Sequence, residues 1–543
     1  MGGPLMSIVR SIGRPTGMAS GVAVLATGFA ALTGAMSTAG AATHADGVRA
    51  SGPVVMTQAG PVRGLSVDGM HQFLGDPYAA PPVGRLRWRP PQPAAYHRAL
   101  LNATILGPEC AQPATFFGAA STSEDCLQLN VYAPAASTGA TKRPVLVWTH
   151  GGALFYGSSR QYDPRPLVRR GTVVVTVNYR LGALGFLAHP ALSAEAGGSS
   201  GDYGLMDQQA ALRWVRHNIN SFGGNAHNVT IDGESAGGLS VLAQVASPTS
   251  AGLFNRAIVQ SGGYNLRQTS QATANAAGSL YAAAVGCSKQ TAACLRSRPV
   301  AQLLANQKVD VYGYLPNIDG RILPRSIGQA LATGRFNKVP MINGTTSDEG
   351  RIFVAIMFDL AGRPLTAARY TEAIASLLRV SPTTAVRIAA RYPQSAYPSP
   401  DLALAAVGTD GIFACPSRQI TMSLSRYEPT YAYEFADRHA PQRYLPPVSF
   451  PYGAYHAAEL QYLFDLPTAP VPGTLTQTQQ QLARAMQQDW TAFAATGTLN
   501  RTNATAWPVY RRDTERFERF SPPTPTVASD FASRHHCRFW SGK

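Results

Sequence analysis

The sequence predicts an α/β fold, with one mostly parallel central sheet flanked by helices. Continuous apolar runs at residues 144–149 (PVLVWT) and 172–179 (TVVVTVNY) are typical of strands that are buried on both faces. Such strands alternate along the chain with segments of helical character, an order that indicates a parallel sheet covered on both sides. No internal repeat or linker interrupts this alternation. We therefore expect residues 42–543 to form a single domain with large insertions.

The elements are predicted in chain order as follows. The proline-rich segment 73–93 excludes a regular helix, and residues 123–134 end in a strand-like pattern. After the two apolar strands, one helix is indicated by a stripe of apolar residues and ends at Gly223, the stripe being Leu205, Leu212, Val215 and Ile219. Further strands are expected at 229–231, 256–260, 339–343 and 430–435. Further helices are expected at 270–285, within 365–392, from His456 onward and at 476–496.

The first 41 residues are expected to be a secretory signal peptide. Arg10 and Arg14 precede an apolar run of small residues at 18–36, and Ala39-Gly40-Ala41 offers an A-x-A cleavage site. An uncleaved membrane anchor is the alternative, but this run contains glycines and is only marginally long enough to span a bilayer. We expect a secreted protein that is cleaved after Ala41 and keeps no membrane span.

Charge and cysteine usage narrow the class of partner. The chain has 46 Lys and Arg against 30 Asp and Glu, a net charge of +16, but the basic residues form no long run. A nucleic-acid site would combine clustered basic residues with aromatics, so no nucleic-acid partner is expected. Six cysteines, an even number, favour disulfide bonds in an oxidising compartment. Neither C-x-x-C nor H-E-x-x-H spacing occurs, so no metal or cofactor is expected.

The segment 228–238 (NVTIDGESAGG) contains a candidate nucleophile. Its short strand leads into GESAG, a G-x-S-x-G pattern that is placed between a strand and a helix. The turn is so tight that a Cβ at Gly233 or Gly237 would collide with backbone, and it holds Ser235 in a strained conformation with Oγ projecting. The helix N-terminus that follows supplies free N–H groups and a positive dipole end, which suit a developing anion.

A serine nucleophile needs a base and an acid that orients the base, in the chain order Ser, acid, His. The segment after the expected strand 339–343 offers Asp348 and Glu349, and position alone favours neither. His439 soon follows a strand and His456 lies where a turn meets a helix, so the residues alone leave these two candidates equal.

The charge that develops on a carbonyl oxygen needs backbone N–H donors. The N–H of Ala236, next after the nucleophile, supplies one donor. Further donors are expected from the glycine-rich loop at 150–153 (HGGA), where small side chains let the main chain approach a substrate.

These segments together resemble the type-B carboxylesterases of the α/β-hydrolase fold, the family of cholinesterases and bacterial carboxylesterases. The matching stretches occur in family order between residues 73 and 464, namely FLGDPYAAPPVGRLRWRPPQP, SEDCLQLNVYAP, HGGALFYG, GDYGLMDQQAALRWVRHNINSFGG, NVTIDGESAGG, AIVQSGG, TSDEG and YHAAELQYLF. The resemblance implies a serine carboxylesterase that hydrolyses small-molecule esters through an acyl-enzyme on Ser235, without a metal or cofactor.

The resemblance also implies roles for individual residues. The acid would be Glu349 and the base His456, the histidine of H-x-x-E, which makes His439 a surface residue. The oxyanion donors would be the N–H groups of Gly152, Ala153 and Ala236. Glu234 and Ser261 match positions that support the triad, although an ordinary packing role fits Ser261 equally well. The implied disulfides are Cys110–Cys126, Cys287–Cys294 and Cys415–Cys537.

Two departures from the family pattern bear on the substrate. Ala153 stands where many members have a third glycine, which trims the space beside the acyl carbon. The loop between Cys110 and Cys126 contains no tryptophan, so a cation–π site for choline is not expected. This loop is also too short for the lid of a lipase, which disfavours a lipase acting on longer-chain acylglycerols. A non-catalytic binding or adhesion protein is the other alternative, but such members lose the serine or the histidine.

Overall fold

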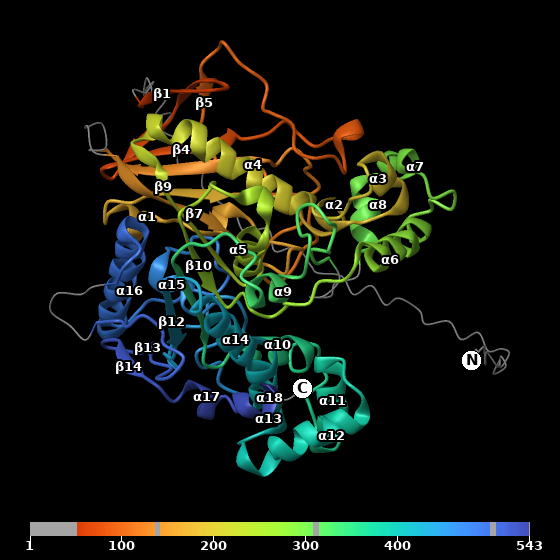
Figure 1. Ribbon diagram of the computed structural model, residues 1–543, viewed down its shortest axis with the longest axis vertical. Helices are drawn as coiled ribbons and strands as arrows, with labels where there is room; N and C mark the ends of the chain where they lie inside the picture. The colour runs from red at the N-terminus through yellow and green to blue at the C-terminus, as the bar shows by residue number, and fades with distance from the viewer. Residues whose placement is uncertain (1–51, 136–141, 308–313, 500–505, 542–543) are drawn as a thin grey trace, which may run out of the picture. The chain divides into compact units, whose positions relative to one another are not determined.

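The computed structural model describes residues 52–135, 142–307, 314–499 and 506–541, and eleven of its strands form one sheet (Figure 1). In sheet order the strands are β14 (Thr526–Ala528), β13 (Phe517–Phe520), β12 (Thr430–Phe435), β11 (Met341–Thr346), β10 (Arg256–Gln260), β9 (Gly224–Glu234), β7 (Arg143–Thr149), β8 (Val173–Val177), β6 (Gln128–Pro134), β4 (Met70–Pro77) and β3 (Leu65–Val67). The strands from β13 to β8 run parallel, and antiparallel strands extend the sheet at both edges. The predicted mostly parallel sheet is confirmed. The expected signal peptide, residues 1–41, lies outside the described residues.

A second, smaller sheet forms near the start of the described chain. Its strands are β1 (Val54–Thr57), β2 (Gly60–Arg63) and β5 (Leu101–Asn102). Strand β2 pairs antiparallel with β1 and parallel with β5.

Successive residues of the central strands serve two different hydrophobic cores. On β7, Val145 and Val147 belong to one core, whereas Leu146 and Trp148 belong to the other. This follows from the geometry of a strand, whose successive side chains point to opposite faces. Because both faces are apolar, both must be covered by helices.

Helices cover each face of the sheet. One core contains residues of α4 (Tyr203–Asn218), α5 (Ala236–Ala246), α9 (Ile327–Ala332) and α14 (Cys415–Leu424), and is extended by α2 (Gly182–Phe186), α3 (Pro190–Glu195), α6 (Gln271–Ala284), α7 (Ala292–Ser297) and α8 (Val300–Ala305). The other contains residues of α1 (Arg165–Val168), α10 (Gly350–Met357), α11 (Tyr370–Leu378), α12 (Pro382–Arg391), α13 (Pro400–Gly408), α15 (Leu460–Leu463) and α16 (Gln477–Thr496). Figure 1 shows α5 and α16 on opposite sides of the central strands.

Most predicted helices are present, and their ends follow the expected chemistry. Thr476 caps α16, since its hydroxyl accepts a hydrogen bond from Gln479 N while the Gln479 side chain accepts one from Thr476 N. The helix that was predicted from His456 is wrong at its start, because α15 begins only at Leu460. Ala457 has a φ of 71°, in the left-handed region, and a right-handed helix cannot contain it.

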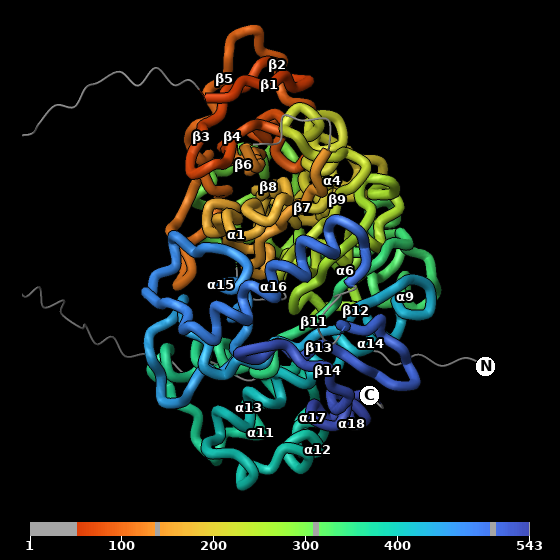
Figure 2. Tube along the Cα trace, turned by 90° about the vertical axis from the view of Figure 1, so that its left-hand side faces the viewer, coloured from red at the N-terminus to blue at the C-terminus, as the bar shows by residue number. Residues whose placement is uncertain are grey.

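Three disulfide bonds are present, Cys110–Cys126, Cys287–Cys294 and Cys415–Cys537, and they are the pairs that the resemblance implies. The third joins the start of α14 to α18 (Cys537–Ser541), which follows α17 (Phe531–Arg534). Figure 2 shows these two terminal helices beside α11, α12 and α13. The C-terminal segment is thereby tied to the helices that cover one end of the sheet.

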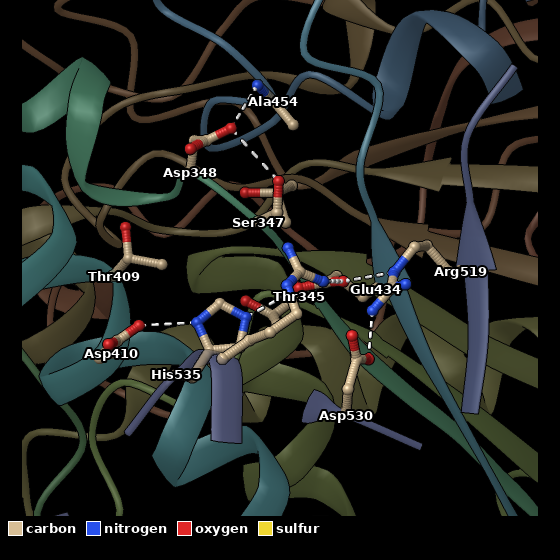
Figure 3. Close-up of polar contacts among 12 residues, drawn as sticks. Thr345, Ser347, Asp348, Thr409, Asp410, Glu434, Ala454, Arg519, Asp530 and His535 are labelled. Carbon is tan, nitrogen blue, oxygen red and sulfur yellow. Dashed lines mark hydrogen bonds and ion pairs between the residues drawn. The ribbon is translucent and has the colours of Figure 1, made fainter. Parts of the chain in front are cut away.

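A buried ionic cluster around His535 also holds the C-terminal segment (Figure 3). The Nδ1 atom of His535 lies 2.6 Å from Asp410 Oδ1, and its Nε2 lies 2.7 Å from Glu434 Oε1. Glu434 also accepts hydrogen bonds from Arg519 at 3.2 Å and from Arg534 at 2.5 Å. Burial by itself would lower the pKa of His535, but the two carboxylates outweigh it and raise this pKa to about 9.

We expect this cluster to stabilise the fold in a pH-dependent way. Because the pKa of His535 is raised from 6.5 to about 9 on folding, its contribution is complete below pH 6.5 and is lost as the pH rises through 9. Replacing His535→Gln should lower the free energy of unfolding by about 3 kcal/mol at pH 6 and by much less at pH 10. Urea unfolding at both pH values measures this difference.

His439→Gln is the matched control, because His439 is exposed to solvent. It should change the free energy of unfolding little at either pH. An equal loss for His535→Gln at pH 6 and pH 10 would show that the imidazolium charge does not stabilise the fold.

Candidate active site

Ser235 lies at the sharp turn between β9 and α5. Its φ is 55° and its ψ is −119°, which places a non-glycine residue at positive φ. A Cβ at Gly237 would lie 2.0 Å from Thr149 O, and one at Gly233 would lie 2.5 Å from the Gly237 backbone. Only glycine fits at these two positions, as the sequence predicts. The Ser235 side chain is partly exposed, although the residues on both sides of it are buried.

Glu349 and His456 form a close buried pair. Nδ1 of His456 lies 2.5 Å from Glu349 Oε2. The other carboxylate oxygen of Glu349 accepts hydrogen bonds from Ser261 Oγ at 2.5 Å, from Thr346 N at 2.8 Å and from the Thr345 hydroxyl. Because a carboxylate only accepts, Nδ1 is the protonated nitrogen of a neutral His456 ring, and Nε2 is left to act as a base.

Asp348, the other acid that the sequence offers, has a different environment. Its carboxylate accepts a hydrogen bond from Ala454 N at 3.1 Å and pairs with Arg351 at 2.8 Å and Arg438 at 3.1 Å (Figure 3 shows the contact with Ala454). Asp348 therefore holds the loop that leads to His456 by a hydrogen bond from the loop backbone. His439, the other candidate base, is exposed.

Two further glutamates surround His456. Nε2 of His456 lies 3.2 Å from Glu234 Oε1 and makes no hydrogen bond with any group in the described part of the chain. Glu459 is fully buried, and within the same residues neither of its carboxyl oxygens has a hydrogen-bond partner. Sequence reasoning did not single out Glu459, although it is the acidic residue of the H-x-x-E motif that marks His456.

The electrostatics of the site follow from this crowding of carboxyl groups. Burial alone would lower the pKa of His456, but the charges of Glu234 and Glu349 and the hydrogen bond that Nδ1–H donates to Glu349 raise it to about 9. Burial would raise the pKa of Glu349, but His456 and the hydrogen bonds to the carboxylate lower it. Burial raises the pKa of Glu234 to about 7 and that of Glu459 well above its usual range. Glu349 thus stays charged beside the imidazole at lower pH, and Glu234 becomes charged as well once the pH exceeds about 7.

Ser235 and His456 both line a cavity of about 590 Å³. Its wall is mainly apolar and aromatic, with the rings of Phe116, Phe117, Tyr156, Phe353, Phe413 and Tyr444. Phe353 and Phe413 also pack against the imidazole of His456, with ring centroids 5.0 and 4.9 Å away. No local pattern in the sequence could identify these two residues, because they come from α10 and from the π-helical turn Thr409–Ala414.

The glycine-rich loop after β7 forms another part of the cavity wall. Gly152 and Ala153 both line it, with φ values of 102° and 54°. A Cβ at Gly152 would lie 2.0 Å from Tyr156 O, so this position requires glycine. Among the described residues, the N–H groups of Gly152 and Ala153 donate no hydrogen bond. Ala236 begins α5, and the first N–H of a helix has no acceptor within that helix. The site can thus offer several backbone donors to an anion.

Comparisons with known proteins agree with this arrangement. A family model described as the carboxylesterase family matches residues 51–540. The para-nitrobenzyl esterase of Bacillus subtilis (strain 168) is 34% identical over 480 residues, which cover 85% of this chain and 93% of that protein. The cocaine esterase of Homo sapiens is 32% identical over 531 residues, which cover 91% and 92%. A solved structure titled PNB esterase superposes with a TM-score of 0.74 at 32% identity, and covers 89% of this chain and 98% of that one.

The charge of Glu234 should set the pKa of His456. We expect His456 to titrate near pH 9, and Glu234→Gln to lower its pKa by roughly one unit or more, because a nearby negative charge is removed. The downfield proton NMR signal of the Nδ1–H, followed across a pH series, measures both values.

Glu372→Gln removes the same charge from an exposed residue and should leave the titration of His456 unchanged. A pKa that is equal in the wild type and in Glu234→Gln would mean that Glu234 does not interact with the imidazole.

Proposed function

This chain belongs to the carboxylesterase family and is a carboxylic ester hydrolase, and from this premise we propose that it acts through a covalent acyl-enzyme on Ser235. One observation carries the proposal. The strained Ser235 and His456 line one cavity, and the buried Glu349 lies 2.5 Å behind His456, at Nδ1. A serine becomes a nucleophile when an oriented base takes its proton, and these three residue types supply that chemistry.

The reaction follows from these roles. Nε2 of His456 accepts the proton of the Ser235 hydroxyl as Oγ attacks the ester carbonyl, and Glu349 holds the ring and stabilises the imidazolium. The C–O bond to the alcohol then breaks, and the alcohol leaves with the proton from His456. Water, deprotonated by His456, attacks the acyl-enzyme and releases the carboxylic acid and free Ser235.

The developing negative charge on the carbonyl oxygen is held by the backbone N–H groups of Gly152, Ala153 and Ala236. Ser261 supports this machinery through its hydrogen bond to Glu349, and Glu234 does so through its charge beside Nε2. Because the pKa of His456 is raised, we expect activity to increase with pH until this imidazole is neutral.

The cavity favours neutral esters with apolar or aromatic groups. Its wall is mostly aromatic and aliphatic, and about 590 Å³ accommodates a ligand of drug-like size. The names of the relatives, para-nitrobenzyl esterase and cocaine esterase, are consistent with this class of substrate. The loop between Cys110 and Cys126 contributes phenylalanines but no tryptophan to the cavity, so we do not propose choline esters as substrates.

We also propose that the protein is exported, with residues 1–41 removed as a signal peptide and residues 42–543 forming a single domain. Three disulfide bonds support an oxidising destination. Among the described residues, no helix has the length and apolar character needed to cross a membrane. The described residues, from Gly52 onward, belong to one compact unit.

The nucleophile is tested by hydrolysis of p-nitrophenyl esters of increasing acyl chain length, beside Ser235→Ala. Under conditions in which deacylation is slower than acylation, we expect p-nitrophenol to appear in a burst equal to the number of active sites. For Ser235→Ala we expect a loss of about 10⁴-fold or more in kcat. Activity that persists in Ser235→Ala would refute the acyl-enzyme. Preference for long chains with activation at an oil–water interface would favour the lipase alternative.

Export is tested by expressing the full chain in a secreting host and sequencing the N-terminus of the protein that leaves the cell. We expect this protein to begin at Ala42, since Ala39-Gly40-Ala41 fits the cleavage preference for small residues. Protein that stays in the membrane fraction and still begins at Met1 would support an uncleaved anchor instead.

A further inference from the structure

We infer that Gln112 is a positioning residue that holds the oxyanion-hole turn, residues 151–157, in its working geometry. Gln112 belongs to neither the nucleophile turn nor the Glu349–His456 pair, and it lies in the loop that the Cys110–Cys126 disulfide closes. The inference rests on the oxyanion role proposed above for Gly152 and Ala153.

The side-chain amide of Gln112 is buried and bound at both of its ends. Its Oε1 accepts a hydrogen bond from Gly157 N at 2.8 Å, and its Nε2 donates to Gly157 O and to Cys110 O, both at 3.1 Å. Gln112 itself is only 1% exposed. One side chain thus binds both the N–H and the C=O of Gly157, and it links them to the backbone of Cys110 in the disulfide.

Gly157 in turn contacts the start of the oxyanion turn. Its φ is 112°, and a Cβ there would lie 2.6 Å from Gly151 O and 2.6 Å from His150 Nδ1. Burial lowers the pKa of His150 to about 4, so its ring is neutral and Nδ1–H can donate to Gly151 O at 2.8 Å. Because Gly157 fits this closely against Gly151, a displacement of Gly157 would move the peptide that leads into Gly152.

The turn is closed internally as well. The N–H groups of Phe155 and Tyr156 both donate to Gly152 O, at 2.9 and 3.0 Å. These bonds fix the direction of the Gly152–Ala153 peptide relative to the far end of the turn. The turn therefore moves as a unit, and Gln112 binds that unit at Gly157.

The disulfide loop meets the same region at a second place. The ring of Phe117 stacks on Tyr156 with centroids 5.2 Å apart and planes 2° from parallel, and Phe117 O accepts a hydrogen bond from Gln161 Nε2 at 2.7 Å. These contacts shape the cavity wall, because all three residues line it. Gln112, by contrast, bonds to the backbone of the turn that carries the N–H donors, at Gly157, on the side of the disulfide loop. We therefore expect Gln112 to affect the transition state and the Phe117 contacts to affect substrate binding.

The test is Gln112→Met, which keeps the side-chain volume and removes all three hydrogen bonds. Misplaced oxyanion donors should lower kcat about 10- to 100-fold and leave KM within about twofold, since these donors act mainly on the charged intermediate. The affinity for an aryl trifluoromethyl ketone, whose adduct with Ser235 places an oxyanion in the hole, should fall by the same factor as kcat/KM. Active-site titration by the p-nitrophenol burst corrects each rate for the fraction of folded enzyme.

Ser121→Ala is the matched control in the same loop. The hydroxyl of Ser121 donates to Glu109 O at 2.7 Å and does not touch the oxyanion turn, so this variant should keep the wild-type kcat. If Gln112→Met does not fold, the variant Gln112→Glu tests the same positioning role. It keeps an acceptor for Gly157 N but loses the donor, and its kcat should also fall while KM stays unchanged.

An unchanged kcat in the Gln112 variants, or an equal fall in Ser121→Ala, would overturn the positioning role. A wild-type protein that gives no burst when deacylation is slow would instead count against the acyl-enzyme, so each proposal can be refuted independently of the other.

Discussion

The parallel register of four neighbouring strands brings the chemistry of this protein together. Thr149 of β7 pairs with Gly233 of β9, Glu234 of β9 pairs with Gln260 of β10, and Gln260 pairs with Gly344 of β11. Parallel strands in register end at the same edge of a sheet, so the loops that leave them are neighbours. Those loops carry the glycine-rich turn, Ser235, Ser261 and Glu349, in that order across the sheet. A slip of register by one residue would turn each of these side chains away from the common cavity.

Burying several carboxyl groups at this same edge of the sheet is unfavourable electrostatically. Three glutamates, Glu234, Glu349 and Glu459, are buried around a single imidazole, and burial disfavours the charge on each of them. His456 lowers the pKa of Glu349 most, through its charge and its hydrogen bond, and the hydrogen bonds from Ser261 and Thr345 lower it further, so this carboxylate stays ionised while burial raises the pKa of the other two. The contact with His456 and the other hydrogen-bond donors around Glu349 together keep it ionised.

Segments that are remote in sequence make this edge rigid. The loop closed by Cys110 and Cys126 reaches the oxyanion turn through Gln112, and Asp348 joins the loop of Glu349 to the backbone beside His456. On the far side, His535 and the Cys415–Cys537 disulfide secure the π-helical turn whose Phe413 packs on the imidazole. Each of these hydrogen bonds, ion pairs and disulfide bonds holds a short irregular segment. Irregular segments lack the regular backbone hydrogen bonds that make helices and strands rigid.

The sequence by itself determined the fold class, the order along the chain of the strands from β6 to β12 and the position of Ser235, because these depend on local patterns. Apolar runs such as PVLVWT indicate strands that are buried on both faces, and GESAG between a strand and a helix is typical of a nucleophile turn. The residues alone did not separate Glu349 from Asp348 or His456 from His439, and the family resemblance was needed for that choice. Only the tertiary structure decided that Glu349 faces His456, that Asp348 faces Arg351, and that Gln112, Phe413 and Glu459 adjoin the site. Glu349 and His456 are 107 positions apart, and Gln112 and Gly157 are 45 apart, so packing and not a local spacing along the chain brings these pairs together.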